Sequence, residues 1–168
     1  VTDFHSVWET MLRETLARSP HDSRRNWNSE LPKPVYALIG NGGDAPRSRG
    51  MQTDIILEHQ SGFTIVDAKY YTAKDADSAP GWPDIAKQMF YEKALREIVD
   101  KTGQPANIIN NVFAFPSLSK AGPLASVDMR RTDGTAANRT VFPPIACTYL
   151  PMREVLASYV SGSQDIAL

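Results

Sequence analysis

The sequence lacks several features that would place it in a specialised class of proteins. Its 168 residues contain a single cysteine, Cys147, which excludes a framework of internal disulfides and a zinc site built from cysteines. No apolar run approaches the ~20 residues of a membrane span, and no segment has the pattern of a signal peptide. These absences favour a globular protein of the reducing cytoplasm.

The chain also lacks an excess of positive charge. Its formal net charge is -1 and its pI about 6.3, so composition gives no global signal for nucleic-acid binding. Basic residues can still act locally, and Arg24, Arg25, Arg47 and Arg49 are candidate DNA contacts, with solvated surface as the alternative. The Gly-rich segment 40–50 has no P-loop lysine and opens no helix, which argues against nucleotide binding there.

The order of the expected elements indicates the fold class. With 42% hydrophobic and 22% charged residues, residues 1–168 are expected to form one domain. Periodicity predicts helices over 3–18, 82–101 and 151–159, and strands over 35–40, 52–58, 63–71, 108–117, 125–131 and 140–149.

This order of helix, three strands, helix and strand predicts an α/β sandwich, a central mixed sheet flanked by helices. We expect a core over about 3–116 and a C-terminal appendage, a hairpin and a helix, over about 117–168. Because the chain starts at Val1, a non-Met residue, we also expect it to be a fragment of something longer.

Two charged residues interrupt an apolar run in the stretch "TDIILEHQSGFTIVDAKYY", residues 53–71. Asp67 and Lys69 share one face of their strand, because strand side chains alternate. If residues 59–62 form the turn of a hairpin, Asp54 lies directly opposite Asp67. Side chains that face each other in this way have Cβ atoms roughly 4.5–5.5 Å apart.

Two carboxylates at that separation predict a metal ion or a shared proton. A pair of oxygen ligands suits Mg²⁺, which typically takes one or two protein carboxylates and keeps waters. The ion would activate water, and the Lys69 ammonium would orient or deprotonate that water or stabilise transition-state charge. The alternative, a salt bridge on a half-exposed strand, stays open.

The helix over 82–101 offers a further polar residue. Gln88 falls on the apolar face of this helix and needs a partner there. If the helix packs across the sheet, Gln88 can reach the carboxylates. The alternative is a glutamine tolerated at the edge of an apolar stripe.

These residues together resemble the PD-(D/E)XK nuclease signature. Asp54 is followed by "DAK" at 67–69, "QMFY" at 88–91 resembles the Q-x-x-Y element of RecB-like members, and "WETML" at 8–12 resembles the acidic first helix. More narrowly, the chain is similar to LlaJI-type restriction endonucleases and to McrC-like nuclease subunits. Thr53 departs from the pattern, which has proline at that position.

The resemblance implies a Mg²⁺-dependent DNA endonuclease of a restriction system with an αβββαβ core. Asp54, Asp67 and Glu9 would hold the metal, for which Mn²⁺ would substitute, and Lys69 and Gln88 would join them in catalysis. Periodicity does not choose between Glu9 and Glu14, but the family pattern favours Glu9.

The implied partners are double-stranded DNA and either a second copy in a homodimer or a separate AAA+ NTPase of the McrB kind. Tyr91 is a further candidate for DNA contact. The alternatives are a RecB-like exonuclease and a catalytically silent DNA-binding module of the same fold.

Overall fold

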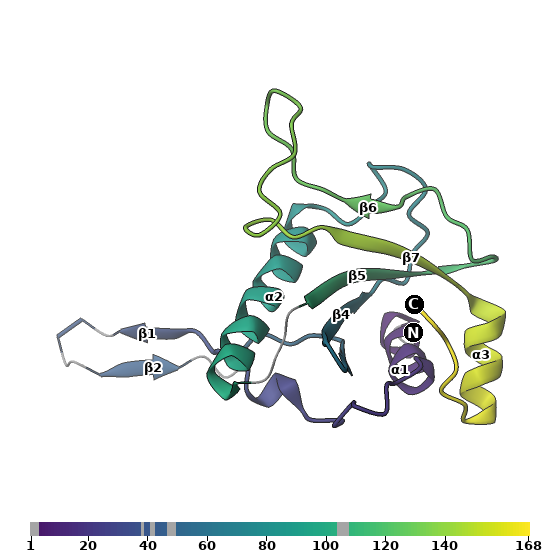
Figure 1. Ribbon diagram of the computed structural model, residues 1–168, viewed down its shortest axis with the longest axis horizontal. Coiled ribbons are helices and arrows are strands. Elements are labelled where there is room, and N and C mark those ends of the chain that lie inside the picture. The colour runs from purple at the N-terminus through teal and green to yellow at the C-terminus, as the bar shows by residue number, and fades with distance from the viewer. Residues whose placement is uncertain (1–3, 38, 41–42, 47–49, 104–107) are drawn as a thin grey trace.

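A computed structural model describes residues 4–37, 39–40, 43–46, 50–103 and 108–168 (Figure 1). Its elements are α1 (Phe4–Thr15), a 3-10 turn (Trp27–Ser29), β1 (Val35–Ala37), β2 (Asp44–Pro46), β3 (Ile55–His59), β4 (Gly62–Ala68), α2 (Trp82–Thr102), β5 (Ile108–Ser117), β6 (Ser126–Val127), β7 (Ile145–Pro151) and α3 (Met152–Ser161).

The predicted α/β sandwich is confirmed as a five-stranded mixed sheet with helices on both faces. The strand order is β3-β4-β5-β7-β6; β4, β5 and β7 run parallel, and β3 and β6 join the two sides antiparallel. Helix α2 covers one face, and α1 and α3 cover the other (Figure 1). Such a sheet is shielded from water on both faces, which suits its central apolar strands.

The core has an apolar cluster on each face of the sheet. On the α1 and α3 side, Trp8 and Leu12 pack against Val66, Val112 and Val155. On the α2 side, the packed residues include Phe63, Ile65, Tyr91, Leu95 and Val99. Strand β4 contributes to both clusters and is buried along its whole length, so Asp67 sits in a strand that is otherwise apolar except for Thr64.

Helix α2 follows its sequence signals closely. Gly81 precedes it, Pro83 lies in its first turn, and Gly103 ends it in a left-handed conformation. The strand predicted over 108–117 is confirmed residue for residue as β5.

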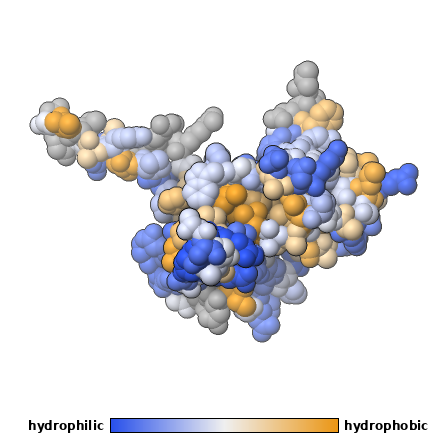
Figure 2. Space-filling model, turned by 90° about the horizontal axis from the view of Figure 1, so that it is seen from above, coloured by the Kyte–Doolittle hydropathy of each residue, from blue (hydrophilic) through white to orange (hydrophobic). Residues whose placement is uncertain are grey.

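The strand predicted over 35–40 does not join the central sheet. Residues Val35–Ala37 form β1, all exposed, and pair only with β2, which lies in the segment expected to be a loop. This two-stranded arm stands away from the body of the molecule (Figures 1 and 2). A three-residue strand with no buried face cannot compete for a place in the core. Among the described residues, β3 and β4 are therefore the strands of the central sheet that lie between α1 and α2.

The C-terminal third completes the sheet rather than forming an appendage. Strand β7 pairs in parallel with β5 over seven residues, and β6 pairs with β7 as the predicted antiparallel hairpin, although β6 has only two residues. The last segment returns to α1, where Ile166 exchanges backbone hydrogen bonds with Thr15 and Ala17. Within the described part of the chain, no helix has the length and apolar character needed to cross a membrane.

Candidate active site

The β3–β4 hairpin brings Asp54 beside the end of β4 in the predicted register. Glu58 lies opposite Phe63 and Ile55 opposite Val66, so Asp54, one residue before β3, lies level with Asp67. The turn holds only Gln60 and Ser61 and is therefore shorter than predicted, but its register is the same. Asp54 Oδ2 accepts a hydrogen bond of 2.8 Å from the Ala68 amide, which fixes its carboxylate at the end of β4.

The crowding of carboxylates changes the protonation of Asp54. Burial and then the neighbouring charge of Asp67 raise the pKa of Asp54 to about 6, and Glu9 adds to the effect; the Ala68 amide opposes it. A group with this pKa is ionised at neutral pH at the cost of lost hydration and, next, of like-charge repulsion. A cation placed between these carboxylates would relieve that repulsion.

Lys69 lies between two carboxylates at this end of β4. Its Nζ is 2.7 Å from Asp67 Oδ2 and 2.6 Å from Asp84 Oδ1 at the start of α2. Burial alone would lower the pKa of Lys69, but the two carboxylates outweigh burial and raise it. Lys69 is therefore an ammonium ion, and it also lies near the Phe113 ring, 5.7 Å from the ring centroid.

Asp84 and Lys87 belong to the site although neither was predicted for it. Lys87 Nζ lies 3.2 Å from Asp67 Oδ1 and 3.6 Å from Asp84 Oδ1. Burial opposes ionisation of both groups, but Asp67, followed by Asp84, raises the pKa of Lys87. Lys69, followed by Lys87, lowers the pKa of Asp84. Their i,i+3 spacing just before Gln88 was a weak signal, because such pairs are common on exposed helices.

Gln88 reaches the sheet, as predicted, but contacts the backbone of β4. It is completely buried, and its Nε2 donates a hydrogen bond of 3.0 Å to the Ile65 carbonyl, two residues before Asp67. Among the described residues, its Oε1 atom has no hydrogen-bond partner. Gln88 thus docks α2 on β4, while its role toward Lys69 or a phosphate stays a prediction.

Tyr91 is a support for the site rather than part of its surface. It is 6% exposed, and its hydroxyl donates to the Gln52 carbonyl in the segment that leads into Asp54. Burial, followed by the charges of Asp54 and Asp67, raises the pKa of Tyr91 to about 12. This burial argues against the predicted contact with DNA.

Helix α1 brings Glu9 close enough to influence Asp54. The charge of Glu9 contributes to the raised pKa of Asp54, and Glu9 forms an ion pair with Arg13. Arg13 in turn donates to the Asp54 carbonyl at 3.3 Å. The structure therefore links Glu9 to the site electrostatically, while metal binding by Glu9 stays a prediction.

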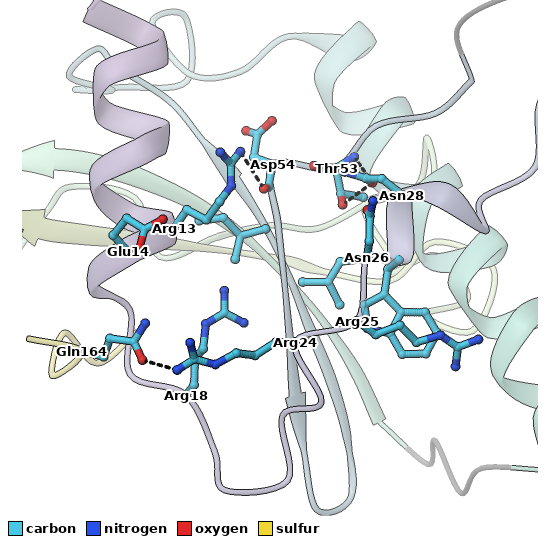
Figure 3. A pocket seen from close by; sticks show the side chains of 13 residues that line it. Arg13, Glu14, Arg18, Arg24, Arg25, Asn26, Asn28, Thr53, Asp54 and Gln164 are labelled. Carbon is cyan, nitrogen blue, oxygen red and sulfur yellow. Dashed lines mark hydrogen bonds between the residues drawn. The ribbon is translucent and has the colours of Figure 1, made fainter. Parts of the chain in front are cut away.

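The predicted DNA contacts fall into two groups. Arg47 and Arg49 lie outside the described residues. Arg24 and Arg25 line a pocket next to Asp54, together with residues of α1 and β3 (Figure 3).

The site fits a metal ion in its donor chemistry but is not a preassembled cage. Within the described ranges, no three or more His, Cys, Asp or Glu side chains are grouped to hold a metal ion. Asp54 and Asp67 are nevertheless two adjacent carboxylates. Among the described residues, the buried Asp67 Oδ2 has the ion pair with Lys69 at 2.7 Å but no further hydrogen bond. Two carboxylates are what Mg²⁺ typically takes from a protein.

Two comparisons with known proteins link the sequence to restriction enzymes. Residues 1–133, which include the whole β3–β4 hairpin and α2, match the family model described as LlaJI restriction endonuclease. The type II restriction enzyme BsuMI component YdjA of Bacillus subtilis (strain 168) is 28% identical over 169 residues, covering 96% of this chain and 31% of that protein. The chain thus spans about a third of the length of this relative.

Proposed function

The chain belongs to the LlaJI restriction endonuclease family, and on that premise we propose that it is the Mg²⁺-dependent DNA endonuclease domain of a restriction system. It hydrolyses phosphodiester bonds of double-stranded DNA with water as the nucleophile. The observation that carries the proposal is the meeting of Asp54 and Asp67 at the end of one hairpin, with the buried Lys69 ammonium 2.7 Å from Asp67.

Asp54 and Asp67 would hold the Mg²⁺ ion, for which Mn²⁺ would substitute, and Glu9 would be a further ligand. When bound, the ion neutralises charge on the phosphate and lowers the pKa of a water molecule. Lys69 is held as an ammonium by Asp67 and Asp84. It therefore serves as a donor that orients water or stabilises phosphate charge, rather than as the base that removes a proton.

The other residues of the site set its geometry. Gln88 fixes α2 against β4, and its buried Oε1, which has no partner among the described residues, is an acceptor available to water or to Lys69. Lys87 pairs with Asp67 Oδ1 while its own side chain is 40% exposed. It is therefore the cation most able to move aside and contact a phosphate when an ion binds Asp67.

The fold detail supports the PD-(D/E)XK core that we propose for the chain. An N-terminal helix, the β3–β4 hairpin, the crossing helix α2 and the parallel strand β5 follow one another around the carboxylates. Of the three strands expected between the two helices, the first, over 35–40, has no counterpart among the described strands of the central sheet, since β1 lies in the separate arm.

The partners we propose follow from the chemistry of duplex DNA. Two strands must be cut, so a homodimer or a paired active site is expected. The relative's name identifies it as one component of a restriction enzyme. A separate NTPase subunit is therefore an alternative partner for this chain.

One observation favours a second candidate, a catalytically silent DNA-binding module. Asp67 is paired with two lysines, and the described residues offer no group of three metal ligands. Such a module would bind DNA equally well with and without a divalent ion.

Incubation of supercoiled plasmid with the wild type and with Asp67→Asn, in Mg²⁺ and in EDTA, tests the proposal. We expect nicked and linear plasmid from the wild type in Mg²⁺ only, and a loss of at least about a hundredfold in rate for Asp67→Asn. Degradation of linear but not circular DNA would instead indicate an exonuclease. If the wild type does not cleave DNA with Mg²⁺ or Mn²⁺, alone or with its partner components, the nuclease function is wrong and the catalytically silent DNA-binding module is favoured.

A further inference from the structure

An arginine-lined pocket opens along the free edge of the sheet. Strand β3 is the edge strand, and a pocket of about 280 Å³ lies against Ile55 and Ile56 on it (Figure 3). Asp54 lies at one end of this pocket and Gln164 at the other (Figure 3). The arginines that line it are Arg13, Arg18, Arg24 and Arg25.

These arginines differ in how their charge is compensated. Three of them form ion pairs with carboxylates: Arg13 with Glu9, Arg18 with Asp22 at 2.7 Å, and Arg25 with Glu30. The Arg24 guanidinium instead donates to the neutral amide oxygen of Gln164 at 2.9 Å. Among the described residues, Arg24 is therefore the pocket arginine that has no carboxylate partner, and its charge is available to an anionic ligand.

The loop that carries Arg24 is firmly anchored to β3. The Glu58 side chain is nearly buried and accepts hydrogen bonds from Ser23 N at 3.0 Å, Ser23 Oγ at 2.8 Å and Trp27 Nε1 at 2.8 Å. Trp27 is itself buried against Phe63, edge to face. A buried carboxylate with three donors fixes the loop on both sides of Arg24.

The backbone of Arg24 has an unfavourable conformation. Its φ is 54°, and it is the residue other than glycine with a positive φ in the described part of the chain. Its amide donates to Asp22 Oδ1 at 2.8 Å, which helps to hold it there. A side chain with a Cβ is strained in this region, and such residues cluster where a protein clamps a ligand.

From these contacts we infer that the pocket is a phosphate subsite, in which Arg24 binds a backbone phosphate of the DNA strand that runs from the Asp54 end along the edge of β3. This inference rests on the proposed function and deepens it. Arg13, which bridges Glu9 and the Asp54 carbonyl, lies between the candidate catalytic carboxylates and the subsite. The subsite holds a flanking phosphate and takes no part in the chemistry.

Binding of a short labelled DNA duplex in EDTA, at salt concentrations from about 50 to 200 mM, tests the subsite on the complete protein. Arg24→Gln and Arg24→Gly should each bind roughly tenfold more weakly than the wild type. The slope of log K against log salt should become shallower by about one, the value for one lost phosphate contact. Arg24→Gly also relieves the positive φ, so it should melt at or above the wild-type temperature.

Arg139→Gln is the matched control, because Arg139 is an exposed arginine paired with Asp128 outside this pocket. It should keep the wild-type slope and affinity. If both Arg24 variants bind DNA with the affinity and slope of the wild type, the subsite is wrong. If inorganic phosphate alone raises the melting temperature of the wild type but not of Arg24→Gly, while duplex binding is unchanged, the pocket takes free phosphate rather than DNA.

The outcome separates the subsite from the proposed function. A wild type that cleaves plasmid while the Arg24 variants bind and cleave like it would overturn the subsite alone. A wild type that shows the Arg24-dependent salt slope but never cleaves would overturn the nuclease function and support the subsite. A wild type that does not bind DNA at all would contradict both.

Discussion

At the scale of single residues, the candidate site brings together charged side chains that are buried or lie close to like charges. Asp54 lies near Asp67 and Glu9, and its pKa is raised to about 6. Lys69 is buried between Asp67 and Asp84. Charged groups are rarely buried unless they are paired or bind a metal. The arrangement is therefore better explained by chemistry than by folding stability.

Asp54→Asn should stabilise the fold at alkaline pH while removing activity. A carboxyl with a folded pKa of about 6 and an ordinary value of 3.8 favours folding below 3.8, and this contribution is lost as pH rises through 6. At pH 8 the ionised group costs on the order of 1–3 kcal/mol. Denaturant unfolding should show Asp54→Asn more stable by this amount at pH 8, with the gap closing near pH 4.

Asp100→Asn on the exposed side of α2 serves as the control and should show no such gap. Adding Mg²⁺ at pH 8 should raise the melting temperature of the wild type and leave that of Asp54→Asn unchanged. Because an ion must displace the Asp54 proton, this Mg²⁺ effect should weaken below about pH 6. Equal Mg²⁺ stabilisation of both proteins would show that Asp54 is not a ligand.

Asp84 positions Lys69, and replacing Asp84 should change how the cleavage rate depends on pH. Asp84→Asn removes one of the two carboxylates that hold Lys69 and raise its pKa. We expect the cleavage rate to fall about tenfold and the loss of activity at high pH to begin at a lower pH, because Lys69 must stay protonated. Single-turnover cleavage between pH 6 and about pH 10 measures both effects.

The equivalent change at Asp128, which pairs with Arg139, provides a comparison away from the site. If Asp84→Asn cleaves DNA more slowly but loses activity at the same high pH as the wild type, Asp84 supports the fold and does not raise the pKa of Lys69.

At the scale of elements, the β3–β4 hairpin determines the site through its register. A slip of one residue would turn Asp67 to the opposite face of the sheet. Gly62 helps to fix this register, because a Cβ placed there would lie 1.8 Å from the Ile108 carbonyl oxygen of β5. The hairpin is thereby held against the strand that continues the sheet.

Gly62→Val should therefore destabilise the protein by at least about 2 kcal/mol, since backbone atoms cannot move aside as a side chain can. Chemical denaturation measures the loss. Gly43→Ala in the arm meets open space and should unfold like the wild type. A wild-type midpoint for Gly62→Val would contradict the close approach of β4 and β5.

The elements differ in how far the sequence could predict them. The alternation of side chains and the turn assumed between the two strands were enough to place Asp54 opposite Asp67. Once Glu58 lies opposite Phe63, each step back along β3 matches one step forward along β4. The arm strand β1 was misplaced, since three apolar-looking residues between turn signals say nothing about which strand will pair with them. Asp84 and Lys87 were missed because their role depends on where α2 crosses β4, which is a tertiary property.

At the scale of the whole molecule, the sheet places chemistry and binding at neighbouring positions. The ends of β4 and α2 carry the carboxylates and lysines, while the outer edge of β3 carries the arginine-lined pocket. The family match covers residues 1–133, which contain the carboxylates, the lysines and every pocket residue except Gln164. A strand of DNA entering along this edge would reach Asp54 and then Asp67.

The most direct test of the central claim measures cleavage and binding separately for Lys69→Ala. The control is Lys101→Ala, which removes an exposed lysine paired with Glu97 on the last turn of α2. With plasmid DNA and Mg²⁺, we predict that Lys69→Ala binds DNA within about threefold of the wild type but cleaves it at least about a hundredfold more slowly, whereas Lys101→Ala does both normally. Cleavage by Lys69→Ala at the wild-type rate would contradict the assignment of this hairpin as the catalytic centre.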